Sequence, residues 1–221
     1  MRLYGWHSSS TTFRVRIALA LKRCSYEHIP VNLRWEHSDH DRPEYRTFNP
    51  QTNIPVLVDD RAKIAQSLAI IEYLKETRPE PPLLPKLSSQ RARVRSLALF
   101  IACEIQPPSN LRVQRRLKAQ FHATAEALSS WQLHWCELGF DSLESQLAGN
   151  SDTGRFCQGD TPTVADCFLV PSVYSSLRPV IGADLSKWPT IRRIYDACLA
   201  MPEFERSLPQ NQPDFESPVG H

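Results

Sequence analysis

A run of five hydroxyl side chains near the N-terminus is the stretch with the clearest chemical potential. It spans Ser8 to Thr12, after a short apolar start and before a segment of helical composition. This order predicts a strand, a loop and then a helix whose first turn is capped by serine or threonine. Hydroxyl donors and unpaired backbone N–H groups at a helix start favour an anion such as a thiolate or a carboxylate. The same run also suits an ordinary cap without a ligand, and the motif alone favours that simpler interpretation.

The elements that would position this run alternate along the first third of the chain. Residues 2–6, 12–22 and 26–33 are predicted to form a strand, a helix and a strand. Such a unit is right-handed and its two strands are parallel. Two short antiparallel strands, 54–58 and 63–65, are expected next. A helix capped by Ser67 follows them.

Three prolines between Glu80 and Pro85 separate this α/β part from the remainder of the chain. Beyond them no convincing strand is found, and apolar residues recur at helical spacing over 91–105 and over 123–147, with a break expected near Gly139. Thr163 and Asp166 form a predicted capping box at the start of a buried helix.

Composition excludes several classes of partner. The 221 residues carry a net charge of only +2, so no long-range field favours nucleic acid or a membrane surface. The cluster of basic residues from Arg112 to Lys118 is interpreted as the solvated face of a helix. Six scattered cysteines form no CxxC pair and no metal-ligand spacing, which indicates a reducing compartment and no metal site. With no signal sequence and no long apolar span, a cytoplasmic protein is predicted.

Several separate motifs carry a resemblance to one family. The segment Ser9-Ser10-Thr11-Thr12-Phe13-Arg14-Val15-Arg16-Ile17-Ala18-Leu19 resembles the zeta-class glutathione transferase signature Ser-Ser-Cys-Ser-x-Arg-Val-Arg-Ile-Ala-Leu. Four further segments resemble that class in the same order: Asn49-Pro50 with Ile54-Pro55, Gln66 to Leu74, Ile105 to Leu111, and Gly159 to Pro171. The resemblance implies a glutathione transferase fold, in which an α/β thioredoxin-like N-terminal domain precedes an all-α C-terminal domain. The expected boundaries are 1–80 for the glutathione-binding domain, 81–88 for the linker and 89–221 for the helical domain.

The resemblance also implies a glutathione site and its residues. Ser9 matches the catalytic serine of the family, and Ser10 and Thr11 occupy the next two positions. Pro55 is expected to be cis, although most X–Pro bonds are trans, which would expose the Ile54 backbone to the cysteinyl part of glutathione. Gln66 and Ser67 are expected to bind the γ-glutamyl carboxylate; three further glutathione contacts are expected from His40, Gln51 and Gln106.

Arg178 and Asn110 match residues that contact the substrate. Two simpler interpretations stay open, because His40 is equally typical of a solvated loop and Arg178 could cap the preceding helix. Three departures from the family pattern stand out: Thr11 replaces the family's cysteine, Ser8 replaces an arginine, and Leu111 favours maleylacetoacetate over maleylpyruvate.

The resemblance therefore implies a homodimeric, glutathione-dependent isomerase of maleylacetoacetate or maleylpyruvate type, in aromatic catabolism. The cofactor would be glutathione and the substrate a keto-acid or dicarboxylate. Two alternatives remain: a zeta-like transferase that conjugates or dehalogenates α-halo acids, and a glutathione-binding protein with little catalysis. The isomerase and the transferase both need the thiol of glutathione to ionise, because its reference pKa of about 8.5 leaves it mostly protonated at neutral pH.

Overall fold

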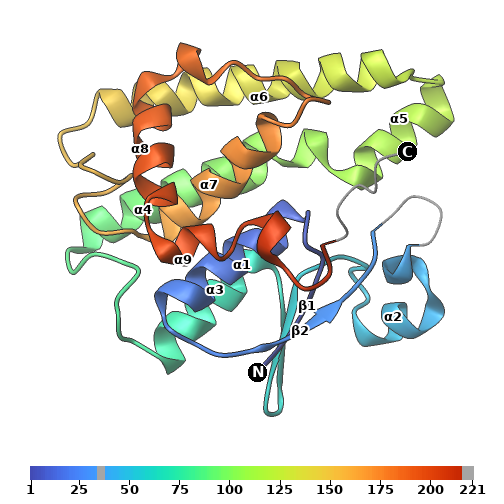
Figure 1. The fold of residues 1–221 in the computed structure, drawn as a ribbon, viewed down its shortest axis with the longest axis horizontal. Coiled ribbons are helices and arrows are strands. Elements are labelled where there is room, and N and C mark those ends of the chain that lie inside the picture. The colour runs from blue at the N-terminus through green and yellow to red at the C-terminus, as the bar shows by residue number, and fades with distance from the viewer. Residues whose placement is uncertain (34–37, 216–221) are drawn as a thin grey trace. The chain divides into compact units, whose positions relative to one another are not determined.

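The structure is a computed structural model that describes residues 1–33 and 38–215, and it contains two compact units (Figure 1). The first unit is Met1–Leu83 together with a C-terminal segment, Ala200–His221, and the second is Leu84–Leu199.

The first unit is built on a mixed four-stranded sheet of order β2-β1-β3-β4. Its strands are β1 (Arg2–Gly5), β2 (Glu27–Pro30), β3 (Val56–Asp59) and β4 (Ala62–Ala65). Its helices are α1 (Ser10–Leu21), α2 (Pro43–Phe48), α3 (Ser67–Thr77) and α9 (Pro202–Glu205). β1 pairs with β2 in parallel and β3 pairs with β4 in the antiparallel sense, as the sequence predicts. β3 also pairs with β1 in the antiparallel sense, which places β1 at the centre of the sheet beside β3.

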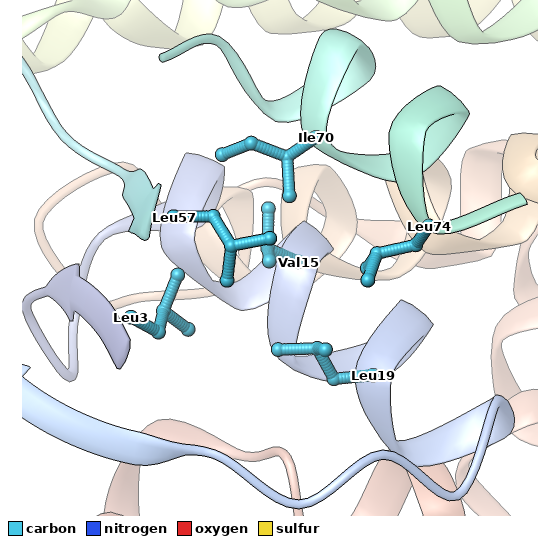
Figure 2. Close-up of a cluster of buried hydrophobic side chains, with 6 residues drawn as sticks. All are labelled: Leu3, Val15, Leu19, Leu57, Ile70 and Leu74. Atoms are coloured by element: carbon cyan, nitrogen blue, oxygen red, sulfur yellow. The ribbon is translucent and has the colours of Figure 1, made fainter. Parts of the chain in front are cut away.

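The two faces of the sheet carry different helices. Successive residues of a strand point to opposite faces of the sheet, so the side chains of Leu3 and Tyr4 in β1 lie on different faces. On one face, α1 and α3 pack against the sheet through a buried cluster of six side chains (Figure 2): Leu3, Val15, Leu19, Leu57, Ile70 and Leu74. On the other face, the Tyr4 ring lies 4.5 Å from that of Phe48 in α2. Both apolar faces of the sheet are thus covered.

A buried arginine joins the C-terminal segment to the rest of the first unit. The Arg16 side chain, on α1, donates to the carbonyl of Ser207 at 3.0 Å, to that of His7 at 3.0 Å and to that of Trp6 at 3.4 Å. Burying a guanidinium is costly unless its donors are satisfied, so these three carbonyls hold the segment against the loop before Ser9. The boundaries expected from the sequence assign this segment to the helical domain, 89–221.

Asp214, in the same C-terminal segment, makes a pH-dependent contact with His7 and His28. It accepts from the His7 N–H at 2.8 Å, and its Oδ1 lies 3.1 Å from Nε2 of His28. Burial by itself raises the pKa of the Asp214 carboxyl, but the contacts with His28 and with the His7 N–H outweigh it and hold that pKa below its ordinary value. The carboxylate therefore stabilises the fold above the unfolded-state pKa of about 4, and this stability is lost as the pH falls through the lower folded-state pKa.

We accordingly expect Asp214→Asn to lower the free energy of unfolding at neutral pH by about 1–2 kcal/mol. The difference from the wild type should shrink as the pH falls below about 4. Urea unfolding across this pH range measures both effects, with Asp196→Asn, on the exposed face of the chain, as the matched control. A constant difference at every pH would show that the Asp214 charge has no part in the contact.

Among the described residues, the second unit contains helices and their connecting loops but no strand. Its α-helices are α4 (Ser88–Phe100), α5 (Leu111–Phe121), α6 (Ala125–Ala148), α7 (Val164–Ser176) and α8 (Pro189–Leu199). A π-helical turn, Ile101–Ile105, continues α4 to the end of the predicted 91–105 helix. No helix in the part of the chain that the structure describes has the length and apolar character needed to span a membrane.

The break predicted near Gly139 does not occur, because α6 runs through it as one helix of 24 residues. Gly139 is buried against Ile105, and a Cβ atom there would lie 2.5 Å from Ile105 Cγ1. The glycine therefore permits α6 to pack closely on the π-helical turn that contains Ile105. The prediction of a break is wrong because the glycine is required for this close packing and does not interrupt the helix.

The capping box at the start of α7 is confirmed. Asp166 accepts from the Thr163 N–H at 2.7 Å, from the Thr163 hydroxyl at 3.1 Å and from the Cys157 N–H at 2.9 Å. Asp166 is completely buried, so its carboxylate also fixes the preceding loop to the helix start.

Candidate glutathione site

The sheet topology brings three predicted segments to one edge. β1 and β4 are each antiparallel to β3, so β1 and β4 end at the edge where β3 begins. α1 follows β1, α3 follows β4, and Ile54–Pro55 comes directly before β3. The segments Ser9–Thr11, Ile54–Pro55 and Gln66–Ser67 therefore lie at the same edge of the sheet, and both helices direct their N-terminal ends there.

Three of the predicted residues are joined by hydrogen bonds at the start of α1. Ser9 is the N-cap of the helix, and its Oγ accepts from the Thr12 N–H at 3.2 Å. Ser9 Oγ lies 2.9 Å from Thr11 Oγ1, and Thr11 Oγ1 donates to the carbonyl of Ile54 at 3.0 Å. α1 has no acidic residue in its first turn, so its partial positive charge is unopposed there.

The cis peptide bond expected between Ile54 and Pro55 is confirmed. Ile54 itself is buried, against Trp6, Val31 and Tyr45. Its carbonyl receives the Thr11 hydroxyl, and no acceptor for the Ile54 N–H is found among the described residues. The main chain of Ile54 thus has a donor available for pairing with an extended peptide ligand.

The start of α3 is open to an anion. Gln66, not Ser67 as predicted, is the N-cap, and its side chain makes no capping hydrogen bond. Gln66 has φ 74°, a left-handed conformation that costs a non-glycine residue on the order of 1–3 kcal/mol and is typical of functional sites. Its Nε2 donates to Gln51 Oε1 at 2.5 Å, so two of the predicted glutathione contacts lie together. α3 also lacks an acidic residue in its first turn, which leaves its first N–H groups suited to a carboxylate.

Arg14 is a contributor that the motif analysis did not identify. It is buried in α1, and its Nη1 donates to Ser67 Oγ at 3.3 Å. This bond ties the N-terminal turns of α1 and α3 together. The sequence does indicate such a role, because Arg14 and Arg16 lie inside an otherwise apolar helix, where a buried charged side chain needs specific partners.

Two other predicted residues of the first unit have less defined surroundings. Ser10 is the first residue of α1 and is half-buried. His40 lies in the short helical turn Asp39–Asp41, is mostly buried, and has its Nε2 3.7 Å from Asp41 Oδ2. The solvated-loop interpretation of His40 is therefore wrong, while its contact with glutathione stays a prediction.

The remaining three predicted residues belong to the second unit. Gln106 ends the π-helical turn, and Asn110 precedes α5 without capping it, although asparagine is among the preferred caps. Arg178 lies just beyond α7, is exposed, and donates to the carbonyl of Ser175 at 3.2 Å and to its hydroxyl at 2.8 Å. These bonds orient the guanidinium, and Asn110 presents an amide that its helix does not use.

The geometry at the sheet edge suits one class of ligand. Helix N-termini, hydroxyl groups and an available main-chain donor together suit an extended peptide that carries anionic groups, as the resemblance to glutathione transferases implies. Buried cysteines of the protein itself are poor substitutes for the thiol of glutathione, since burial raises the pKa of Cys136 to about 12 and raises that of Cys157. The site residues therefore fit glutathione.

Comparison with known proteins leads to the same class. Residues 3–82 match the family model "Glutathione S-transferase, N-terminal domain". The chain is 42% identical over 215 residues to a maleylacetoacetate isomerase of Pseudomonas aeruginosa, covering 97% of this chain and 98% of that protein.

Two solved structures are similar over nearly their whole length. One is a holo maleylpyruvate isomerase described as a bacterial zeta-class glutathione S-transferase, with TM-score 0.93, 41% identity and coverage of 97% and 99% of the two chains. The other is a maleylacetoacetate isomerase of Methylobacterium extorquens AM1 with bound malonate and glutathione, with TM-score 0.93, 36% identity and coverage of 98% and 100%. The chain belongs to the zeta class of the glutathione transferase family.

Proposed function

We propose that the chain catalyses glutathione-dependent cis–trans isomerisation of maleylacetoacetate or maleylpyruvate. The observation that carries the proposal is the linked group Ser9–Thr11–Ile54 at the start of α1, next to a cis-proline and opposite an open α3 N-terminus. The similarity to isomerases of both substrates over nearly the whole chain supports the same reaction.

Residues of the first unit would hold glutathione. The first N–H groups of α3, with Gln66 and Ser67, bind the γ-glutamyl carboxylate, and Gln51 fixes the Gln66 side chain. The Ile54 main chain pairs with the cysteinyl part, as an added strand pairs with a sheet edge. His40 completes the proposed contacts from the first unit, and Gln106, a residue of the second unit, is proposed as one further contact.

Ser9 acts on the sulfur. Bound glutathione would supply a thiolate that adds to the conjugated double bond; rotation about the resulting single bond and cleavage of the carbon–sulfur bond would then release the trans product with glutathione unchanged. The Ser9 hydroxyl donates a hydrogen bond to that sulfur, and the α1 dipole favours its negative charge. Each unit by which the thiol pKa falls corresponds to about 1.4 kcal/mol in favour of the thiolate.

The second unit would hold the substrate. A keto-acid or dicarboxylate needs a cation for its carboxylate and a hydrogen-bond donor for its developing enolate oxygen. Arg178, already oriented by Ser175, is proposed for the first role and Asn110 for the second. Leu111 favours maleylacetoacetate as the substrate. The enzyme is further proposed to be a cytoplasmic homodimer that acts in aromatic catabolism.

The decisive assay follows the absorbance of maleylacetoacetate and maleylpyruvate with and without glutathione, while free thiol is titrated. Glutathione-dependent loss of the cis isomer with no thiol consumed supports isomerisation. Thiol consumption or halide release with α-halo acids, and no isomerisation, would instead identify a transferase. Tight glutathione binding without turnover of any of these substrates would identify a binding protein.

Arg178→Ala provides a separate test of substrate binding. Loss of a charge-assisted hydrogen bond of about 1.5–3 kcal/mol should raise KM for the keto-acid roughly 10- to 150-fold. The dissociation constant of glutathione should stay unchanged. Arg192→Ala, another exposed arginine of the same unit, is the matched control. If Arg178→Ala retains the KM of the wild type, Arg178 serves the end of α7 and not the substrate.

A further inference from the structure

Thr11 occupies the position where the family signature has cysteine, and its hydroxyl connects two parts of the site. Thr11 Oγ1 lies 2.9 Å from Ser9 Oγ and 3.0 Å from the carbonyl oxygen of Ile54. Ser9 and Thr11 are near neighbours in the chain, but Ile54 is 43 residues away. The threonine thus joins the proposed sulfur-binding serine to the proposed peptide-binding main chain.

The directions of these hydrogen bonds follow from the number of protons available. A threonine hydroxyl has one proton, and a carbonyl oxygen can only accept, so the Thr11 proton points to Ile54. Ser9 must then be the donor in its bond with Thr11. Ser9 Oγ itself accepts from the Thr12 N–H. The bonds run in one series, from the Thr12 N–H through Ser9 and Thr11 to the Ile54 carbonyl.

This series directs the only Ser9 proton toward Thr11. A proton committed to Thr11 Oγ1 is not available to a sulfur atom, so Ser9 must rotate its O–H bond before it can stabilise a thiolate. A hydroxyl can accept two hydrogen bonds while it donates one. Ser9 has the Thr12 N–H as one donor, and the Thr11 hydroxyl, 2.9 Å away, can become the second.

Building on the proposed function, we propose that Thr11 is a positioning residue that reverses its hydrogen bond when glutathione binds. The cysteinyl N–H takes over the Ile54 carbonyl, the Thr11 proton rotates to Ser9 Oγ, and the Ser9 proton rotates to the sulfur. No covalent bond changes and no proton is lost from the series. Ser9 then accepts two bonds and donates one, and a hydroxyl that accepts more hydrogen bonds is a stronger donor. Recognition of the peptide is thereby coupled to stabilisation of the thiolate.

Substitutions of Thr11 separate its hydroxyl from its shape. Thr11→Val keeps the shape and removes the hydroxyl, whereas Thr11→Ser keeps the hydroxyl. Thr47→Val is the matched control, because Thr47 is exposed on α2 and its hydroxyl donates only to the local carbonyl of Pro43. The readout is the pKa of enzyme-bound glutathione, measured from the ultraviolet absorbance of its thiolate as a function of pH.

We expect Thr11→Val to raise the pKa of the bound thiol by about one unit, the equivalent of one lost hydrogen bond. Thr11→Ser and Thr47→Val should reproduce the wild-type value. In a Ser9→Ala background, Thr11→Val should have no additional effect, because the threonine acts through Ser9. Thr11→Val should also affect the binding of a glutathione analogue that has a methyl group in place of the thiol. Expressed as a free energy, this change in binding should be smaller than the change in the pKa of the bound thiol.

Four results would overturn the inference. One is a folded Thr11→Val protein whose bound thiol keeps the wild-type pKa. Another is an equal pKa rise from Thr11→Val with and without Ser9, which would show that Thr11 acts independently. If Thr11→Val does not fold, Thr11→Cys replaces it: its weaker donor should raise the pKa relative to Thr11→Ser, and equal values would contradict the inference. A wild-type protein that binds glutathione without lowering its thiol pKa would refute the proposed function itself, and this inference with it.

Discussion

Replacing Ser9 with alanine is expected to lower kcat/KM for the isomerisation about 100- to 1000-fold. Removal of one donor that stabilises a developing or resident negative charge has this effect in other enzymes. Ser9 is placed for it, since it caps α1 and its hydroxyl lies where the helix dipole and the first N–H groups also favour an anion. The pKa of the bound thiol should rise in parallel, which links the rate to the thiolate fraction.

The same substitution removes a helix cap, so a control must separate stability from catalysis. Thr124 caps α6 in the same way, accepting from the Ala127 N–H at 3.2 Å, and it is exposed. Thr124→Ala and Ser9→Ala should each cost about 1 kcal/mol of folding free energy. Only Ser9→Ala should change kcat/KM and the thiol pKa. Equal kinetics for the two variants would show that Ser9 is a structural cap alone.

Replacing Asp166 with alanine should have the largest effect on stability. The change removes three hydrogen bonds at once and leaves the buried N–H groups of Cys157 and Thr163 without acceptors. Each unsatisfied buried group costs about 1–3 kcal/mol, so a loss of about 3–5 kcal/mol is expected. Urea unfolding followed by far-ultraviolet circular dichroism measures it.

Asp184→Ala is the matched control for this prediction. Asp184 also accepts from a backbone N–H, that of Ser186 at 3.0 Å, but it is exposed and begins only a short helical turn. Water can replace that acceptor, so a loss of no more than about 1 kcal/mol is expected. If Asp166→Ala and Asp184→Ala lower the free energy of unfolding by the same amount, burial of the Asp166 hydrogen bonds contributes little to stability.

The elements of the fold were largely predictable because they depend on near neighbours in the chain. Turn signals, helical spacing and the Thr163–Asp166 box each act over a few residues, and the corresponding strands and helices form. The exceptions have long-range causes. Gly139 does not break α6 because it packs on Ile105, and the Ser67 hydroxyl contacts Arg14 while Gln66 takes the cap position.

By itself, the sequence determined the order of the elements as far as the cis-proline and α3, the hydroxyl-rich start of α1 and, through several motifs, the family. Only the tertiary structure decided which side chains meet. It joins Thr11 to Ile54, Gln66 to Gln51 and Arg16 to Ser207. The last pair lies 191 residues apart in the chain. The physical reason is that caps and periodicity are properties of a local segment, whereas the direction of a hydroxyl proton depends on groups that only the folded sheet edge brings within hydrogen-bonding distance.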